Sequence, residues 1–340
     1  MLALVLGGGS ALGAYHGGVV SAMEAAGVEP DWLAGSSIGA VMAALVAGNP
    51  PGRRTAAVRE FWRRSASPDG LASWVPDAWR KAVHLSSALE TRLLGRPALY
   101  HLRAPEFSLI PQRPGVAEDP GVYDAAPMRR LLEELVDFDL LNAGPVRVSV
   151  MTVDLASGQE APFDTARERL GVEHIMASAA LTPAFPAVRI GGRAYVDGSL
   201  AANVPVDLVL QKAPAEPLAC FTADPFPLAA PHPRSLGDAA ERQPDLLFAS
   251  QTERTLRAAR RAWALHGGAA PAAVYRMNYA SQPGETAMKV FDFSQSSLDR
   301  RWRQGERDMQ DALRTWRDTP PHGNTLAIHD AAPAPRVAHA

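Results

Sequence analysis

The hydrophobic pattern of the first fifty residues predicts a strand, a turn and a helix, twice in succession. Residues 2–6 form a continuous apolar run, as in a strand that is buried on both faces. After three glycines, apolar positions recur at helical spacing until Gly27, where a C-cap glycine belongs. Residues 31–35 predict a second short strand, and residues 38–48 predict a strongly apolar helix. This order is typical of an α/β fold with a mainly parallel sheet.

The same patterns predict further elements after residue 50. We expect helices over 53–65, 124–137 and 172–181, and strands over 146–154, 193–199 and 217–222. Residues 66–122 differ, because prolines and tryptophans interrupt the pattern and "LSSALETRLLG" is the one clear helical piece. We therefore predict that 66–122 form a cap inserted into the core and not part of the sheet.

The pattern changes again after residue 223 and divides the chain into four parts. We predict an α/β core over 1–223, a Pro-rich connector over 224–242, a C-terminal, mainly helical extension over 243–317 and a disordered tail over 318–340. The extension contains two arginine-rich helical patterns, over 243–265 and 297–317, with a strand-like run over 272–280 between them.

Composition narrows the function classes and the compartment. The net charge is −2, so the chain as a whole gives no electrostatic reason to expect nucleic acid. Cys220 is the single cysteine, which excludes an intramolecular disulfide and a cysteine-based zinc cluster. We predict neither a metal nor a cofactor. The apolar run of residues 2–6 is too short for a signal peptide or a membrane span, so we expect a cytoplasmic protein, with peripheral membrane contact allowed.

The first strand is followed by a glycine-rich turn, residues 7–10, which we call the glycine loop. Such a turn would point its backbone N–H groups at an anion. A nucleotide phosphate is excluded, because Gly13 is followed by Ala14 and not by Lys and Ser or Thr. A dinucleotide is weakly supported: Gly7, Gly9 and Gly13 give a loosened fingerprint, but Asp31 lies at the amino end of the second strand, where the fingerprint needs a carboxylate at the carboxyl end. A third ligand is the oxyanion of a reaction, and a plain tight turn is the alternative that involves no ligand.

The pentapeptide "GSSIG", residues 35–39, favours the oxyanion. It follows a predicted strand and opens an apolar helix, which is the context of a nucleophile elbow with Ser37 as the nucleophile. Gly35 and Gly39 would allow the sharp turn and keep the site open. The side chain of Ser36 should point in a different direction from that of Ser37.

A serine nucleophile needs a base, and a carboxylate is the best candidate. Asp197 ends the predicted strand 193–199 and is followed by a turn, whereas none of the nine histidines lies in a comparable context. Because catalytic groups gather at the carboxyl ends of strands in open α/β sheets, we expect Ser37, Asp197 and the glycine loop to meet at one edge.

Four segments in this order resemble the patatin-like phospholipases. They are "GGGSALGAYHGG", "GSSIGA", "ASAALTPAFPAV" and "DGSLAANVPV", and they lie within residues 2–206. The resemblance implies a three-layer α/β/α fold and a metal-free hydrolysis of lipid acyl esters by a Ser–Asp dyad. It assigns Ser37 as nucleophile, Asp197 as general base and the amides of Gly8, Gly9 and Ser10 as the oxyanion hole. It predicts a lipid or acyl-ester substrate and no particular oligomeric state.

Two positions depart from the family pattern. Leu12 stands where the family often has Arg or Lys, so an anchor for substrate charge is missing. Ser199 follows Asp197-Gly198, where the family has Gly or Ala, which is a mild change. Because Leu12 carries no charge, a preference for phospholipid head groups does not follow from the resemblance.

Two other function classes stay open from the sequence. One is a Ser–His–Asp esterase that recruits His232 or His266 and acts on another lipid or an intracellular polyester. The other is a non-catalytic protein whose arginine-rich helices meet anionic lipid or a protein partner, although such arginines are more typical of solvated helix faces. These arginines are Arg254, Arg257, Arg260, Arg261, Arg300, Arg301, Arg303 and Arg307.

Apolar residues of the predicted cap and the preceding helix form a candidate acyl-binding mouth, with plain packing against the sheet as the alternative. They are Trp62, Trp74, Trp79, Leu85, Leu89, Leu93, Leu94, Leu99, Phe107 and Leu109.

Overall fold

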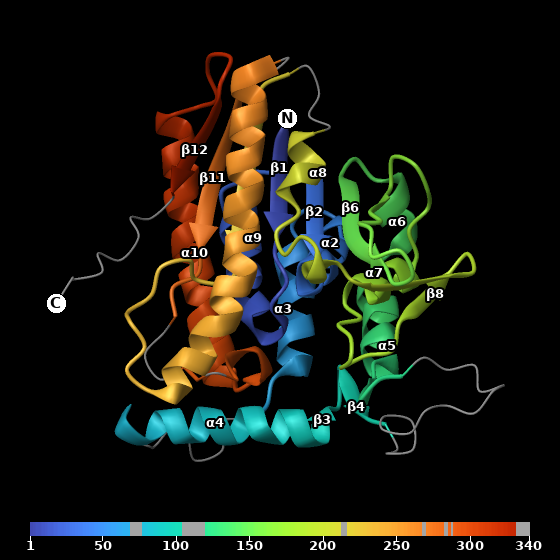
Figure 1. Ribbon diagram of the computed structural model, residues 1–340. Helices are drawn as coiled ribbons and strands as arrows, with labels where there is room; N and C mark the ends of the chain where they lie inside the picture. Colours follow the sequence, from blue (N-terminus) through green and yellow to red (C-terminus); the bar gives the residue numbers. More distant parts are fainter. Residues whose placement is uncertain are drawn as a thin grey trace.

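A mixed, mostly parallel nine-stranded sheet forms the centre of the molecule (Figure 1). The computed structural model describes residues 1–68, 77–103, 120–211, 216–266, 270–281, 285–286 and 288–330. The strand order is β12-β11-β10-β1-β2-β6-β9-β8, and β7 pairs with β6. The strands are β1 (Leu2–Leu6), β2 (Trp32–Ser36), β6 (Arg147–Asp154), β7 (Phe163–Asp164), β8 (Val188–Ile190), β9 (Arg193–Asp197), β10 (Leu218–Asp224), β11 (Ala272–Asn278) and β12 (Leu326–Asp330).

Helices cover both faces of this sheet. The α-helices are α1 (Ala14–Ala25), α2 (Ile38–Ala47), α3 (Arg54–Ser65), α4 (Asp77–Leu94), α5 (Ala126–Leu135), α6 (Phe138–Ala143), α7 (Val172–Ser178), α8 (Val206–Leu210), α9 (Leu236–His266) and α10 (Gln295–Asp318). The described residues also include the short 3₁₀ helices η1 (Ser10–Gly13), η4 (Gly198–Leu200) and η5 (Lys289–Phe291).

Alternate residues of β1 enter two separate hydrophobic cores, which confirms the predicted three-layer α/β/α architecture. Leu4 packs in the core that also contains Val19 of α1 and Trp302 of α10. Val5 packs in the opposite core with Leu256 of α9, and Figure 1 shows α8 and α9 in front of the sheet. The period of two in the strand therefore gives each face its own helical layer.

The C-terminal segment is part of the same layers. β11 and β12 extend the parallel sheet beyond β10. Helix α10 packs tightly on α1: a Cβ on Gly18 would lie 1.9 Å from the Trp302 carbonyl oxygen, and one on Gly305 would lie 2.0 Å from the Tyr15 carbonyl oxygen. Glycine is thus required at both positions of this helix crossing.

Three sequence predictions need correction in this segment. Helix α9 starts at Leu236, inside the stretch predicted as a connector over 224–242. The tail predicted to be disordered over 318–340 contains β12, and its residues 331–340 lie outside the described ones. Arg301, expected on a solvated face, is fully buried, whereas Arg254, Arg257, Arg260 and Arg261 are exposed as expected.

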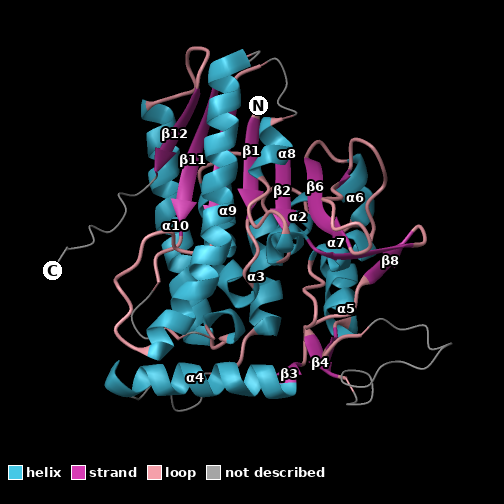
Figure 2. Cartoon of the chain, in the orientation of Figure 1, coloured by secondary structure: helices cyan, strands magenta, loops and turns pink. Residues whose placement is uncertain are grey.

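The described part of the cap over residues 77–103 and 120–122 lies over the end of the sheet toward which the parallel strands point (Figure 2). Its helix α4 is longer than predicted, and the cap also contains strands, which the sequence did not predict. β4 (Tyr100–Leu102) is the central strand of a small antiparallel sheet, in which it pairs with β3 (Gly95–Arg96) on one side and with β5 (Tyr123–Asp124) on the other. The two-residue strands are too short to show a hydrophobic alternation.

Candidate active site

Ser37 lies in a strained turn between β2 and α2. Its φ is +54° and its ψ is −125°, a conformation that a residue with a Cβ rarely adopts. A Cβ on Gly35 would lie 2.4 Å from the Gly39 carbonyl carbon, and one on Gly39 would lie 2.0 Å from the Leu6 carbonyl oxygen. Both glycines therefore let the strand, the turn and the helix approach closely enough to present Ser37 at the edge of the sheet.

Hydrogen bonds from neighbouring elements fix this turn. The Ser37 N–H donates to Ser178 Oγ over 3.0 Å, and Ser178 Oγ donates to the Met151 carbonyl over 2.7 Å. The Ser36 hydroxyl donates to the Ala202 carbonyl over 2.6 Å, which directs it away from Ser37, as predicted. Ser178 and Met151 thereby tie the turn to α7 and β6.

The glycine loop presents two uncommitted backbone donors to the site. Gly9 has a φ of 156° and Ser10 a φ of 51°, and both residues line the same cavity as Ser37. Neither of their N–H groups has an acceptor among the described residues. The Gly8 N–H is different, because it donates to the Asn203 carbonyl over 3.2 Å. Of the three predicted oxyanion donors, two are therefore free to bind a ligand in this structure.

His16 is hydrogen-bonded to the backbone of the glycine loop, a contact that the sequence analysis did not predict. Its Nε2 lies 2.8 Å from the Gly7 carbonyl oxygen, and its side chain is fully buried. Burial lowers the pKa of His16 to about 4, so the imidazole is neutral near pH 7. Because a carbonyl only accepts, Nε2 carries the proton and donates to Gly7.

Asp197 is the last residue of β9, a strand that is antiparallel to its neighbour β6. β9 pairs antiparallel with β6, with Asp197 opposite Thr152, and Ser36 on β2 pairs with Met151. β6 continues for three residues beyond Met151, the partner of the last residue of β2. β9 pairs with this extension in the opposite direction, so its last residue, Asp197, lies next to the end of β2. The predicted meeting of Ser37 and Asp197 at this edge is present, but the reason given for it, a shared strand direction, is wrong for β9.

The Asp197 carboxyl group is buried and electrostatically perturbed. It is 1% exposed, and its Oδ1 accepts the Ser199 N–H over 2.8 Å. Burial raises the pKa of Asp197 to about 6, although hydrogen bonds from the Ser37 hydroxyl and from Ser199 act in the opposite direction. Ser37 and Asp197 thus line the same cavity and interact electrostatically, and with a pKa of about 6 the Asp197 carboxyl group is mostly ionised near pH 7.

An apolar cavity of about 210 Å³ opens beside these groups. Apart from Ser37, Asp197 and the loop, it is lined mainly by aliphatic and aromatic side chains, which suits a hydrocarbon chain. They are Ile38, Val41, Phe61, Leu99, Tyr100, Tyr123, Met128, Leu181, Phe185, Phe226, Phe248, Val290, Phe291 and Phe293.

The cavity corrects the predicted acyl-binding mouth. Among the predicted residues whose side chains the structure describes, Leu99 alone lines it. Trp62 packs in the core, and the α4 leucines Leu85, Leu89, Leu93 and Leu94 are exposed. Trp74, Phe107 and Leu109 lie outside the described residues, and of Trp79 only the backbone is described. Instead, residues of α9 and η5 in the C-terminal segment form one wall, which the helical pattern of that segment did not indicate.

Two polar residues in the cavity wall were also missed. Asn203 is fully buried, and neither polar atom of its side chain has a hydrogen-bond partner among the described residues. Lys289 is 1% exposed, and its Nζ forms an ion pair with Asp245 at 2.8 Å. The signal for Asn203 is its place six residues after Asp197 in "DGSLAANVPV"; no sequence signal marks Lys289.

Histidine and metal chemistry find no support among the described residues. No histidine lines the described cavity; the ring of His232 bonds to the Pro233 carbonyl next to it. No group of three or more metal-ligating side chains occurs in the part of the chain that the structure describes. Nor does any described helix have the length and apolar character needed to cross a membrane.

Two family models match the chain in tandem. A model described as "Patatin-like phospholipase" matches residues 4–210, and one described as "Patatin phospholipase" matches residues 244–323. The chain is also similar to patatin-like phospholipase domain-containing protein 6 of Mus musculus and of Homo sapiens, with 45% identity over 64 residues. That match covers 19% of this chain and 5% of each relative.

Two solved structures show a distant likeness. VipD from Legionella pneumophila has a TM-score of 0.41 and 12% identity, over 92% of this chain and 66% of that one. The type III effector protein ExoU has a TM-score of 0.27 and 16% identity, over 89% of this chain and 53% of that one.

Proposed function

The chain belongs to the patatin-like phospholipase family, and on this basis we propose that it is a serine acyl hydrolase that cleaves carboxylic esters of lipids. The observation that carries the proposal is that Ser37, in its strained turn, and the buried Asp197 carboxyl group lie in the wall of the same apolar cavity. A nucleophile, a base and space for a hydrocarbon chain then lie at one place.

In the proposed reaction, Asp197 takes the proton of the Ser37 hydroxyl as Oγ attacks the ester carbonyl carbon. The N–H groups of Gly9 and Ser10 stabilise the negative charge that forms on the carbonyl oxygen, and Gly8 supports the loop through its bond to Asn203. The C–O bond breaks, the alcohol leaves with the proton, and an acyl-Ser37 ester remains. Water, deprotonated by Asp197, attacks that ester and releases the fatty acid and the serine.

The two alternatives from the sequence are less well supported. A Ser–His–Asp esterase needs an imidazole beside Ser37, and no described histidine lines the cavity. A non-catalytic lipid binder would use the arginine-rich helices, where Arg301 is buried but Arg254 and Arg257 are exposed, and it gives no reason for a strained serine and a buried carboxyl group in one cavity wall. We therefore propose the dyad mechanism alone.

Covalent labelling tests the proposal directly. A fluorophosphonate probe is expected to modify Ser37 stoichiometrically, because an activated serine attacks phosphorus and the free loop amides stabilise the adduct. Mass spectrometry of the peptide that carries residues 36 and 37 identifies the site. Heat-denatured protein is the control and should not react. Absence of labelling in the folded chain, or labelling at another serine, would reject the assignment.

The cavity predicts a dependence on acyl chain length. Val290 is half-buried and lines the cavity, so Val290→Trp should fill space that a long chain would occupy. Each excluded methylene is worth about 0.8 kcal/mol, and losing two lowers kcat/KM about tenfold. We expect this loss on p-nitrophenyl palmitate and little change on the butyrate.

Leu89→Trp is the matched control, because Leu89 is exposed on α4 and does not line the cavity. The ratio of palmitate to butyrate activity should be unchanged in this variant. Equal shifts in the two variants would place the acyl site outside the cavity.

A further inference from the structure

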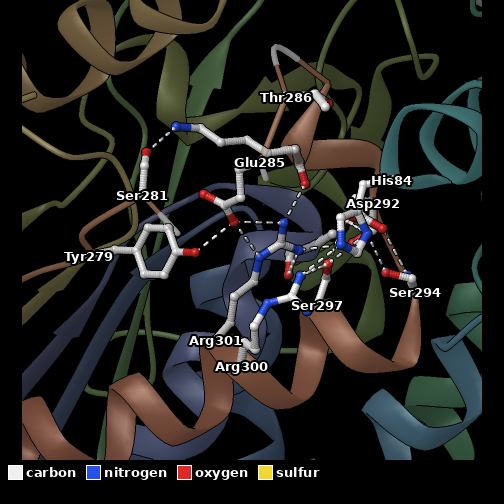
Figure 3. A network of polar contacts seen from close by, with 12 residues as sticks. His84, Tyr279, Ser281, Glu285, Thr286, Asp292, Ser294, Ser297, Arg300 and Arg301 are labelled. Carbon is white, nitrogen blue, oxygen red and sulfur yellow. Dashed lines mark hydrogen bonds and ion pairs between the residues drawn. The ribbon is translucent and has the colours of Figure 1, made fainter. Parts of the chain in front are cut away.

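Every N–H of the Arg301 guanidinium group on α10 is used, and Figure 3 shows the group close to Glu285 and Asp292. Nε and Nη2 both donate to Glu285 Oε1, over 3.2 and 3.1 Å. Nη2 also donates to the Lys289 carbonyl over 3.1 Å. Nη1 donates to the carbonyls of Ala11 and Asp292, over 3.2 and 2.9 Å. No other side chain has five donors in this fixed arrangement, so lysine cannot reproduce these contacts.

The surroundings keep this arginine charged and immobile. Burial disfavours the cation, but Glu285, Tyr279 and Asp292 together raise the pKa of Arg301 above its usual value. Tyr279 donates its hydroxyl hydrogen bond to the same Glu285 oxygen over 2.6 Å. The Asp292 carboxylate lies 3.3 Å from His84 Nδ1 of the cap helix α4. Arg301 is thus a full positive charge, held between the cap and the catalytic core.

A short chain of hydrogen bonds leads from this charge to the proposed oxyanion hole. Arg301 binds the Ala11 carbonyl, which belongs to the same peptide group as the Leu12 N–H. The Leu12 N–H donates to the Gly9 carbonyl over 3.0 Å, and that carbonyl belongs to the same peptide group as the Ser10 N–H. Ser10 lines the cavity, and its N–H has no acceptor among the described residues.

Each bond in such a chain strengthens the next. A peptide group whose oxygen accepts a charge-assisted hydrogen bond becomes a better N–H donor, and bonds in series strengthen one another by about 10–30% each. The direction of the chain, from the guanidinium through two peptide groups, makes the Ser10 N–H its final donor. An ion pair with a purely structural role would not require a chain of hydrogen bonds that leads to the Ser10 N–H.

We propose that Arg301 is a positioning residue for the oxyanion hole, which orients and polarises the Ser10 N–H through the Ala11–Leu12 and Gly9–Ser10 peptide groups. This inference rests on the proposed hydrolase function. It gives the C-terminal segment a part in catalysis in addition to its place in the sheet. The same guanidinium fixes the carbonyls of Lys289 and Asp292, so the oxyanion loop and the η5 wall of the cavity share one anchor.

Arg301→Lys tests the proposal, with Arg300→Lys as the matched control. Arg300 is the next residue of the helix and binds Ser297 and His84, but it has no bond to the glycine loop among the described contacts. Removing one oxyanion donor slows comparable enzymes about 10²- to 10³-fold. Because Arg301→Lys only weakens and misorients a donor, we expect about a tenfold lower kcat with an unchanged KM. Rates are expressed per active site titrated with the fluorophosphonate, which removes any unfolded fraction.

A thionoester substrate separates catalysis from packing. Its sulfur is a weak hydrogen-bond acceptor, so hydrolysis of the thionoester depends less on the oxyanion hole. Arg301→Lys should therefore slow the oxoester more than the thionoester, and Arg300→Lys should slow neither. An unchanged oxoester rate per site, or equal slowing of both substrates, would overturn the role of Arg301. If wild-type protein neither reacts with the probe nor hydrolyses esters, the proposed function itself fails.

A backbone change gives a second test that leaves Arg301 in place. Replacing Leu12 by its α-hydroxy acid analogue turns the amide into an ester, which deletes the Leu12 N–H and weakens the Ala11 carbonyl as an acceptor, while the buried leucine side chain stays. The chain of hydrogen bonds is then cut between Ala11 and Gly9. We expect a fall in kcat similar to that of Arg301→Lys, and this variant decides the question if Arg301→Lys does not fold. A wild-type kcat in the ester variant would contradict the proposal.

Discussion

Replacing Ser37 by alanine is expected to lower the rate of ester hydrolysis by at least about 10⁴-fold without unfolding the protein. The reaction then has no nucleophile, and removing such a group from a serine hydrolase costs about as much as removing the whole catalytic set. Alanine carries the same Cβ as serine, so the strain at a φ of +54° is unchanged. Hydrolysis of a p-nitrophenyl ester gives the rate, and thermal unfolding followed by circular dichroism gives the stability.

Ser36→Ala is the control for this variant. The Ser36 hydroxyl is buried and donates to the Ala202 carbonyl, so its loss should cost about 1 kcal/mol of stability and leave kcat within a fewfold of wild type. Ser37→Gly adds a second check, because glycine tolerates a positive φ and should raise the free energy of unfolding. More than one per cent of wild-type activity in Ser37→Ala would show that another residue forms the acyl intermediate.

The sequence was sufficient to predict the part of the site that depends on local patterns. β1, β2 and α2 are short apolar elements bounded by glycines, and those glycines mark the glycine loop and the turn at Ser37. Glycine has this value because sharp turns and close backbone approaches exclude a side chain. A motif that depends on neighbouring residues in the chain is therefore visible before any tertiary structure is known.

The parts that depend on distant contacts were not predictable in the same way. The direction of β9 follows from how far β6 extends past β2, which no local pattern encodes. The role of Arg301 depends on the Ala11 carbonyl, 290 residues away. One signal was nevertheless present: Arg301 falls on the apolar stripe of α10, with Leu298, Trp302, Gly305 and Met309 at helical spacing. A charged residue on such a stripe is a reason to expect a buried ion pair.

Asp197→Asn is expected to lower kcat/KM by about 10³-fold or more, because asparagine cannot accept the Ser37 proton. In the wild type, kcat/KM should rise with pH and level off above an apparent pKa of about 6, the value to which burial raises the pKa of Asp197. The residual activity of Asp197→Asn should lack this step. A wild-type profile that is flat between pH 5 and 8 would argue against a carboxylate base.

The same substitution is expected to make the fold more stable at neutral and alkaline pH. The pKa of Asp197 is 3.8 in the unfolded chain and about 6 in the fold, so folding favours the protonated form. The stability that this group contributes is complete below pH 3.8 and is lost as the pH rises through 6, a change of about 3 kcal/mol. Asparagine is neutral throughout, so the variant should unfold at higher denaturant concentration than wild type at pH 8 and at a similar concentration at pH 4.

Asp224→Asn distinguishes this effect from a general property of buried carboxyl groups. Asp224 ends β10, burial likewise raises its pKa to about 6, and it does not line the cavity. Its replacement should give a similar gain in stability at pH 8 and leave the pH dependence of kcat/KM unchanged. If Asp197→Asn instead destabilises the protein at pH 8, favourable contacts in the fold stabilise the carboxylate, and burial does not raise the pKa of Asp197 to about 6. We expect Asp197→Asn to gain stability and lose activity, and Asp224→Asn to gain stability and keep its activity. This pair of results would show that burying the Asp197 carboxylate lowers the stability of the fold but is needed for catalysis.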